Sequence, residues 1–452
     1  MQRDSYESLK KWKNSEKRRP LVLMGARQVG KTWLMEEFGK NEFPNDHVIV
    51  NFMRKRSLSR QLESGDIDSA GLLRLLQTAS GQRIVPGRTL LILDEIQECP
   101  SALTSLKFFY EDMPDLAVMA AGSLLGLSYG DYGGSGKVGE KGRAVDSFPV
   151  GKVERLNVYP MTFGEFLRAS GKEMMLDAID SGDWKTVEAL HADYEMELKH
   201  YFVVGGMPEA VSDWITTGSL AEVRKMQRMM LADYDDDFKK HATADMLPKI
   251  RLVWNNVPAQ LAKENKKFIY SALRPGARAR EYEVAIEWLK DAELVYTHYR
   301  VAHPRLPIAH YRDFGAFKLF IHDIGLLGAM SALDPAIVLE KNDLFSNFRG
   351  AMTEQFVLQE LMAQEIESGY WTPDSGVSEV DFVVQGSSGV YPLEAKSATN
   401  TKAKSLGVYM REYSPKIAMK TSLKSYSASS QIHSIPLYAL GRWIKRETQG
   451  NE

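Results

Sequence analysis

Five short apolar runs, separated by longer stretches of mixed polarity, mark the first third of the chain. They cover residues 21–24, 48–52, 89–93, 116–121 and 153–159. Apolar runs of this length that alternate with helical stretches are typical of buried parallel strands. They predict an α/β layer with a parallel sheet, and in such sheets ligands bind where the strands reach their carboxyl ends.

The middle of the chain shows the longer period of amphipathic helices. Residues 163–237 are predicted to be mostly helical, with a break at Val204–Glu209, where a Gly-Gly turn is followed by proline. Three further helical stretches occupy Lys249–Leu294, and a strand pair follows at Val295–Val301 and Phe317–Ile321. Three helices and a small hairpin favour a winged helix.

Strand patterns return in the last quarter, after a helix predicted from about Ala351 to Glu367. Two β-rich runs, 379–384 and 390–396, flank the turn Gln385–Gly389 and predict a hairpin. The whole pattern predicts a multidomain α/β chain. We expect four segments: a parallel-sheet core at 1–165, a helical lid at 166–245, a winged-helix-like domain at 246–338 and a last α/β domain at 339–452.

Composition excludes several classes of protein. A length of 452 residues exceeds what one hydrophobic core supports and suggests about three domains. No apolar run approaches the roughly 20 residues of a membrane helix, and the basic N-terminus lacks the apolar run of a secretory signal. The net charge of −2 argues against wholesale wrapping by nucleic acid. The single Cys99 rules out an intramolecular disulfide and fits a reducing cytoplasm.

The first apolar run ends in Gly25-Ala-Arg-Gln-Val-Gly-Lys-Thr32, which matches the P-loop pattern GxxxxGK[ST]. Glycines let the backbone turn tightly, so that its N–H groups converge on phosphate oxygens at the start of a helix. In this pattern Lys31 reaches the β- and γ-phosphates, and the Thr32 hydroxyl ligates Mg²⁺. A glycine turn without a ligand is the alternative. The residues expected to contact the nucleotide are Gly25, Ala26, Arg27, Gln28, Val29, Gly30, Lys31, Thr32, Trp33 and Asp94.

The second half of the site follows the run at 89–93. Asp94 and Glu95 stand at its carboxyl end, where adjacent acids are costly unless a cation compensates them. We expect Asp94 to hold Mg²⁺ and Glu95 to activate the attacking water, which implies hydrolysis of ATP as well as binding. Ser123 follows the run at 116–121, in the place of a sensor for the γ-phosphate, and the alternative for it is a helix N-cap.

These motifs resemble the AAA-type ATPases of a prokaryotic family in which an ATPase module precedes a C-terminal module of unassigned function. The strings that carry the resemblance are GARQVGKT, LLILDEIQ, AGSLLG and SFPVGKVERLNVYPMTFGEFL. The resemblance spans nearly the whole chain and implies the AAA+ fold, with Ser123 as sensor 1. Lys152, Arg155 and Arg143 are candidates for an arginine finger, and a solvated surface position is the alternative for each.

The hairpin predicted in the last segment carries Asp381, Glu394 and Lys396 among apolar neighbours. Residues i and i+2 of a strand share a face, so Glu394 and Lys396 point the same way, and Asp381 on the paired strand can join them. Two acids and a lysine so placed resemble the PD-(D/E)XK restriction-endonuclease-like fold. In that reading Asp381 and Glu394 hold Mg²⁺, Lys396 stabilises the attacking hydroxide, and Glu354 on the preceding helix completes the site. An exposed hairpin with a surface ion pair is the alternative.

The charges of the segment 246–338 both favour and oppose contact with DNA. Arg274, Arg278 and Arg280 stand at the start of the third helix, where a recognition helix meets a phosphate. Acidic residues of the same helix, such as Glu283 and Glu287, repel DNA. The alternative is a domain that packs on the ATPase and transmits its nucleotide state.

Two functions therefore stay open. The first is an ATP-dependent enzyme acting on DNA, in which the ATPase controls a metal-dependent nuclease. The second is a nucleotide-controlled switch or assembly protein whose last domain binds a partner or nucleic acid without cutting it. We expect ATP and Mg²⁺ as cofactors, DNA as the candidate macromolecular partner, a homo-oligomer as the candidate assembly, no membrane contact and a cytoplasmic location.

Overall fold

The computed structural model describes residues 1–63, 68–122, 149, 151–340, 346–373, 376, 378–396 and 404–449. Its contacts divide the chain into two compact units. The smaller unit contains residues 2–159 together with 291–293, and the larger unit contains most of 160–452. Among the described residues, no helix is both long enough and apolar enough to cross a membrane.

The smaller unit is built on a five-stranded sheet. Its strands are β1 (Leu21–Met24), β2 (His47–Asn51), β3 (Leu90–Asp94), β4 (Ala117–Ala121) and β5 (Glu154–Asn157). The described strand pairings of this sheet are all parallel, and the strand order is β2-β3-β4-β1-β5. The parallel sheet predicted from the apolar runs is thus confirmed. Because β4 lies between β1 and β3, the P-loop strand and the acid-bearing strand are not neighbours.

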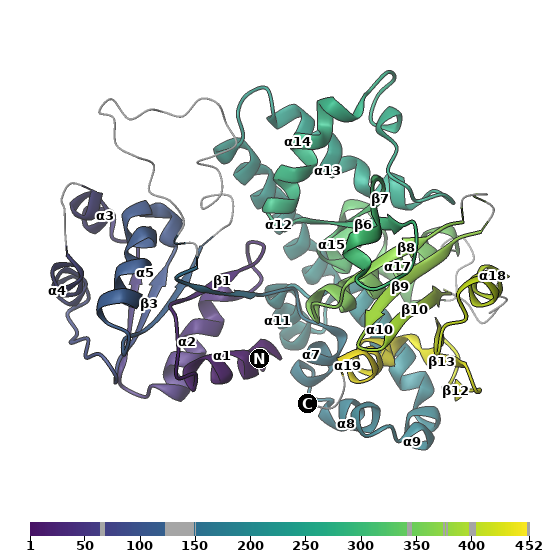
Figure 1. The fold of residues 1–452 in the computed structure, drawn as a ribbon, viewed down its shortest axis with the longest axis horizontal. Coiled ribbons are helices and arrows are strands. Elements are labelled where there is room, and N and C mark those ends of the chain that lie inside the picture. Colours follow the sequence, from purple (N-terminus) through teal and green to yellow (C-terminus); the bar gives the residue numbers. More distant parts are fainter. Residues whose placement is uncertain are drawn as a thin grey trace. The chain divides into compact units, whose positions relative to one another are not determined.

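Helices alternate with these strands and bury them. They are α1 (Ser5–Lys13), α2 (Lys31–Glu42), α3 (Arg56–Glu63), α4 (Ser69–Ser80) and α5 (Pro100–Asp112), with a 3-10 turn at Ile96–Glu98 (Figure 1). Strands β1, β3 and β4 are buried along their whole length, as expected for a sheet whose two faces are covered. Each fully buried aliphatic side chain contributes roughly 1.5–3 kcal/mol, so this core holds the strand ends in a fixed pattern.

The larger unit begins with helices, as predicted. They are α7 (Phe163–Ala169), α8 (Glu173–Ser181), α9 (Trp184–Ala189), α10 (His191–Val204), α11 (Pro208–Thr217), α12 (Leu220–His241), α13 (Leu247–Leu261) and α14 (Ala279–Asp291). Thr162 and Glu165 form a capping box that starts α7. The predicted break at the Gly-Gly-Met-Pro turn is confirmed, because α10 ends at Val204 and α11 begins at Pro208. The second helical stretch expected within Lys249–Leu294 is only a 3-10 turn at Tyr270–Ala272.

The acidic string Tyr234–Asp237 lies inside α12 and is amphipathic. Tyr234 and Asp237 are buried, at 1% and 6% exposed, whereas Asp235 and Asp236 pair with cations at the surface. The string therefore forms part of the packing of α12 as well as its solvated side.

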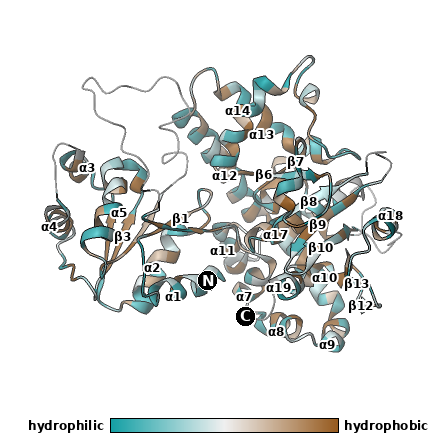
Figure 2. Cartoon of the chain, in the orientation of Figure 1, coloured by the Kyte–Doolittle hydropathy of each residue, from teal (hydrophilic) through white to brown (hydrophobic). Residues whose placement is uncertain are grey.

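An eight-stranded mixed sheet forms the second half of the larger unit. Its strands are β6 (Val295–Val301), β7 (Arg312–Ile321), β8 (Ser368–Trp371), β9 (Val380–Gly386), β10 (Gly389–Ala395), β11 (Ala418–Ser422), β12 (Ser427–Ala428) and β13 (Ile432–Pro436). The order is β12-β13-β11-β10-β9-β8-β6-β7. Helices α15 (Ile324–Met330), α16 (Pro335–Leu339), α17 (Ser346–Ala363), α18 (Lys404–Tyr413) and α19 (Leu440–Gln449) accompany it, with 3-10 turns at Ile308–Tyr311 and Leu437–Ala439. In Figure 2 the strands are coloured mainly hydrophobic, while many helices show both colours.

The hairpin of the predicted winged helix continues this sheet. Strand β6 pairs with β7 on one side and, through Arg300 and Tyr370, with β8 on the other. The pairing joins the segment predicted at 246–338 to the segment predicted at 339–452 in one sheet. The winged-helix assignment and the domain boundary at 338 and 339 stay predictions.

Candidate functional site

The turn after β1 has the backbone geometry that the P-loop pattern predicts. Gly25 has a φ of +140°, and a Cβ there would lie 2.3 Å from the carbonyl oxygen of Val158, so only glycine fits. Gln28 and Gly30 are also left-handed, with φ values of 65° and 91°. Gly30 directly precedes α2, so the N-terminus of this helix opens onto the loop. The arrangement supplies converging N–H groups and a positive helix end for an anion.

Lys31 lies over its own loop. Its Nζ donates to the carbonyl oxygens of Gly25 at 2.6 Å and of Ala26 at 2.8 Å. Burial lowers the pKa of Lys31 to about 8, because a charge is disfavoured where water is excluded. Two neutral carbonyl oxygens compensate the charge of the Lys31 ammonium only in part, and a bound phosphate would compensate it more fully. Trp33, also expected near the nucleotide, is 41% exposed.

Thr32 and Asp94 connect the two halves of the site. The Thr32 hydroxyl donates to Asp94 Oδ1 at 3.0 Å, across the end of the intervening strand β4. Asn51, at the end of β2, donates its side-chain amide to Asp94 Oδ2 at 2.7 Å. Burial and the neighbouring Glu95 raise the pKa of Asp94 against these two hydrogen bonds. The described hydrogen bonds of the buried Asp94 carboxylate come from two neutral side chains, which leave its charge uncompensated. The carboxylate and the Thr32 hydroxyl are hard oxygen ligands of the kind that suits Mg²⁺.

Glu95 is held in an unusual backbone conformation at the start of the next turn. Its φ is 52°, and the Gln97 amide donates to Glu95 Oε2 at 2.5 Å. The other amide atom of Gln97 packs against the end of β4, where a Cβ on Gly122 would lie 2.4 Å from Gln97 Oε1. Non-glycine residues with positive φ often mark functional sites. Glu95 therefore has a fixed direction, set by Gln97.

Sequence reasoning missed Asn51 and Gln97. A polar residue at the carboxyl end of β2 was a usable signal for Asn51, since the other site residues stand at the same position of their strands. Gln97 offered no such signal. The sensor candidate Ser123 and the finger candidate Arg143 lie outside the described residues. Lys152 forms a surface ion pair with Glu111 at 2.9 Å.

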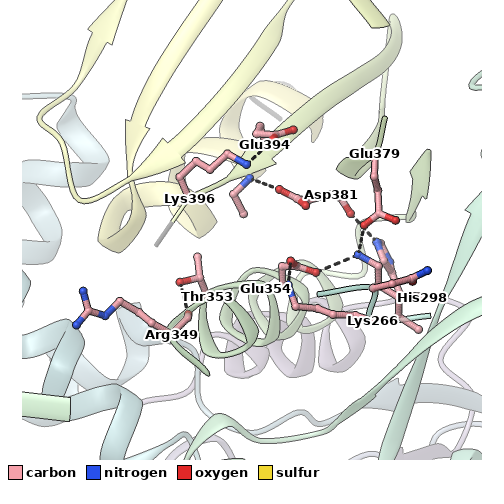
Figure 3. A network of polar contacts seen from close by, with 12 residues as sticks. Lys266, His298, Arg349, Thr353, Glu354, Glu379, Asp381, Glu394 and Lys396 are labelled. Carbon is pink, nitrogen blue, oxygen red and sulfur yellow. Dashed lines mark hydrogen bonds and ion pairs between the residues drawn. The ribbon is translucent and has the colours of Figure 1, made fainter. Parts of the chain in front are cut away.

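The second candidate site lies on the sheet of the larger unit. Strands β9 and β10 form the predicted hairpin, antiparallel from Gly389 and Gly386 onwards. Lys396 Nζ pairs with Glu394 Oε1 at 2.5 Å, so both side chains share a face as predicted. Asp381 Oδ2 accepts a hydrogen bond from the Ala395 backbone N–H at 2.9 Å. The structure thus brings Asp381, Glu394 and Lys396 together (Figure 3).

Glu354 reaches the same region from α17, and two lysines hold it there. Lys266 bonds to Glu354 Oε1, and Lys318 Nζ lies 3.1 Å from Glu354 Oε2 and 2.7 Å from Glu379 Oε1. Glu354 and Lys318 are 5% and 1% exposed. Burial alone would raise the pKa of Glu354, but the two ammonium groups outweigh it and lower the pKa to about 2. Sequence reasoning missed Lys266 and Lys318 because they precede the predicted last domain.

The remaining acids of this cluster hold their protons more tightly. Asp381 keeps part of its surface exposed, yet the surrounding protein and the carboxylates of Glu354 and Glu394 raise its pKa to about 8. Burial also raises the pKa of Glu394. His298 binds the Asp381 carbonyl at 3.1 Å, and its burial beside Lys318 lowers its pKa to about 3. The imidazole is thus neutral near pH 7.

The predicted metal set at this second site fits only in part. Glu394 Oε2 is buried and has no hydrogen-bond partner among the described residues, which leaves one carboxylate oxygen for a cation. Within the described ranges, however, no three acidic, histidine or cysteine side chains are arranged to hold a metal ion together. Both oxygens of Glu354 are engaged by lysines. The sequence predicts that Glu354 completes the metal site, and in this arrangement neither of its oxygens is free to do so. The role of Glu354 stays a prediction.

The exposed cations of the middle segment were candidates for DNA contact. Arg274 is paired with Glu281 on the same segment at 2.7 Å, so its charge is partly compensated within the domain. Arg278 and Arg280 are exposed. DNA binding by this segment stays a prediction.

Three stretches of the chain match known families. Residues 17–167 match the AAA domain family, residues 195–336 match a domain of unknown function (DUF8612), and residues 349–440 match another domain of unknown function (DUF4143). No curated protein matches the chain. The restriction-endonuclease-like reading of the last segment therefore stays a prediction.

Two solved structures are similar only at a distance. A Walker-type ATPase of Pyrococcus abyssi has 13% sequence identity and a TM-score of 0.42, over 73% of this chain and 95% of that one. The ORC1 protein of Aeropyrum pernix, solved in complex with DNA, has 13% identity and a TM-score of 0.27, over 72% and 90%. TM-scores this low carry no argument about this chain. The matched AAA domain and the geometry of the P-loop together show that the chain carries an AAA-type P-loop ATPase domain, which binds and hydrolyses ATP.

Proposed function

We propose that Mg²⁺-dependent ATP hydrolysis at the ends of β1 and β3 is the chemical activity of this chain, and that it controls the state of the larger unit. The contact between Thr32 and Asp94 carries the proposal. It joins the phosphate loop to the acid-bearing strand, and two such oxygen donors are the groups that hold Mg²⁺ beside nucleotide phosphates.

The residues divide the work by position. The backbone N–H groups of the loop from Gly25 and the start of α2 bind phosphate oxygens, and Lys31 leaves its two carbonyls to contact the terminal phosphates. Thr32 and Asp94 would hold Mg²⁺, which neutralises phosphate charge. Glu95 accepts a proton from the attacking water, and Gln97 directs its carboxylate.

Equilibrium binding of ATP to the full chain, with Mg²⁺ and with EDTA, tests these roles. We expect micromolar to millimolar binding that is weakened when Mg²⁺ is removed, and a loss of binding in Lys31→Ala. Lys40→Ala, on the same helix α2 but outside the phosphate loop, is the matched control. Equal ATP binding by wild type and Lys31→Ala would contradict the assignment of the loop.

For the larger unit we propose a nuclease-like domain with two candidate activities. Metal-dependent cleavage of DNA draws on Asp381, Glu394 and Lys396, which share one face of the β9–β10 hairpin. Binding of a partner or nucleic acid without cleavage is the second candidate, because Lys266 and Lys318 occupy both oxygens of Glu354 and leave neither for a metal. The second activity fits the described contacts better, because no three metal-binding side chains are arranged together among the described residues.

DNA incubated with the protein, Mn²⁺ and ATP separates the two candidate activities. Non-cleaving binding predicts that wild type cuts no faster than Lys396→Ala, while a gel-shift or fluorescence assay can still report binding. Cleavage that Glu394→Ala and Lys396→Ala both abolish would establish the nuclease instead. Lys416→Ala, an exposed lysine of the same unit, controls for general loss of positive charge.

A further inference from the structure

The carboxylate cluster of the larger unit has two halves with different partners. In one half, Glu354 Oε1 accepts a hydrogen bond from Lys266 and Glu354 Oε2 accepts one from Lys318. Lys318 also donates to Glu379. In the other half, Glu394 Oε1 binds Lys396, and Oε2 is buried without a partner among the described residues. Figure 3 shows Glu354 and Glu379 on one side of Asp381, and Glu394 with Lys396 on the other.

The ammonium group of Lys318 bridges two carboxylates, those of Glu354 and Glu379. Its ammonium lies 3.1 Å and 2.7 Å from oxygens of two different carboxylates, and 5.1 Å from the centre of the Tyr370 ring. The side chain is 1% exposed. Buried carboxylates without a paired cation are strongly unfavourable. The buried Glu354 carboxylate therefore requires a cation beside it. The protein supplies this cation as the side chain of Lys318, a residue of β7.

We propose that Lys318 is the resident cation of this cluster and takes the place that a divalent metal would otherwise fill between Glu354 and Glu379. A metal ion that binds this domain is then limited to the half formed by Glu394 and Asp381. Glu354 acts as the anchor of Lys266 and Lys318 and does not ligate metal.

The proposal makes the site composite. Lys266, His298 and Lys318 belong to the stretch matched at 195–336, whereas the carboxylates belong to the stretch that contains the match at 349–440. The pairing of β6 with β8 holds the two stretches in one sheet. The middle segment thus supplies the charge that lets the acids of the last segment be buried. This inference needs neither ATP hydrolysis nor DNA cleavage.

Thermal unfolding of the full chain without nucleotide, in EDTA and in Mn²⁺, tests the role of Lys318. In EDTA we expect Lys318→Met to unfold roughly 10 °C below wild type, because it leaves the buried Glu354 with one cation in place of two and removes the cation that binds Glu379. Mn²⁺ is expected to raise the unfolding temperature of Lys318→Met more than that of wild type, since it can occupy the vacated position. The double variant Lys318→Met/Glu354→Gln is expected to recover most of the loss in EDTA, and Lys318→Arg to stay within a few degrees of wild type.

Each outcome decides the question. Failure of Lys318→Met to fold, together with folding of the double variant, supports the proposal, because only charge separates the two. Failure of both to fold overturns it and assigns Lys318 to packing. Equal Mn²⁺ shifts in wild type and Lys318→Met, or unfolding of Lys318→Met at the wild-type temperature in EDTA, also overturn it.

Discussion

At the scale of single residues, the nucleotide site depends on side chains whose partners change when a phosphate arrives. Lys31 donates to two carbonyls of its own loop, and Asp94 is held by Thr32 and Asn51. Neutral groups compensate a buried charge only partly. The charged side chains of the free site are therefore stabilised less by their present contacts than they would be by a bound phosphate and its metal ion.

The pKa of Lys31 gives the ATP site a pH dependence. Because burial lowers this pKa to about 8, the free protein carries an ammonium at pH 7 and loses it above pH 8. Bound phosphate favours the ammonium and raises the pKa again. We expect the Kd for ATP to be flat between pH 6.5 and 7.5 and to rise by about tenfold per pH unit above pH 8. Isothermal titration calorimetry across this range measures it, and a flat Kd up to pH 9.5 contradicts the assignment.

Gln97 is predicted to act through Glu95. Gln97→Ala frees the Glu95 carboxylate, and we expect kcat for ATP hydrolysis to fall by roughly tenfold or more, while ATP binding changes little. Gly122→Ala is expected to have a similar effect, because its Cβ would displace the Gln97 amide. Steady-state kinetics separate kcat from KM. An unchanged kcat in both variants excludes a positioning role for Gln97.

The sequence locates the main residues of this candidate site because their motifs are local. The spacing of Lys31 and Thr32 in the P-loop, and the place of Asp94 after an apolar run, are both visible without a structure. Asn51 and Gln97 act through contacts across strands and across a turn, which no spacing in the sequence records. The order of strands, with β4 between β1 and β3, likewise depends on long-range pairing.

At the scale of elements, the Gly-Gly turn between α10 and α11 is a point of close approach within the larger unit. The carbonyl oxygen of Gly206 accepts a hydrogen bond of 2.6 Å from the Met161 backbone N–H, and the Gly206 N–H donates to the Asp323 carboxylate at 2.6 Å. Burial raises the pKa of Asp323 to about 6 against these hydrogen bonds. The turn therefore connects the start of α7, the end of α10 and the start of α15, and the close approach of the Met161 backbone leaves no room for a side chain at Gly206.

Substitution of this turn is expected to destabilise the larger unit. A Cβ on Gly206 would lie 2.1 Å from the Met161 carbonyl oxygen, so Gly206→Ala is expected to lower the free energy of unfolding by about 3 kcal/mol or more. Gly218→Ala is the matched control, because a Cβ there meets open space and only its φ of +62° is unfavourable, at roughly 1 kcal/mol. Chemical denaturation measures both. Equal losses would show that the close approach at Gly206 is unimportant.

The sequence pattern locates most elements of the larger unit but not their neighbours. The strand pair at Val295–Val301 and Phe317–Ile321 and the hairpin with Asp381 and Glu394 are visible as alternating runs. Their union in one sheet depends on a pairing between β6 and β8, which are separated along the chain by strand β7 and by helices α15, α16 and α17. Lys318 enters the acidic cluster through that union, so local patterns could not assign it there.

At the scale of the whole molecule, the chain divides after Tyr159 into two compact units. One carries the ATP site, and the other carries both the helical segment and the mixed sheet. The sheet crosses the boundary predicted at 338 and 339, so we propose that residues 160–452 behave as one folding unit with a composite acidic cluster.

Fragments of the chain test this division. We expect residues 160–452 to unfold in a single cooperative transition, because their core and sheet are continuous. Residues 339–452 alone are expected to lack a cooperative transition, since they leave β8 unpaired with β6 and the carboxylates without Lys266 and Lys318. Circular dichroism during thermal unfolding compares the two fragments. A cooperative transition in 339–452 alone would contradict the composite cluster.

The central claim is that Lys31, Thr32, Asp94 and Glu95 form one site that binds ATP and hydrolyses it. Single-turnover hydrolysis of radiolabelled ATP by the full chain, compared between wild type and Glu95→Gln, tests it most directly. We predict that Glu95→Gln binds ATP with near wild-type Kd but hydrolyses it at least about 100-fold more slowly. Hydrolysis by Glu95→Gln at the wild-type rate would contradict the account.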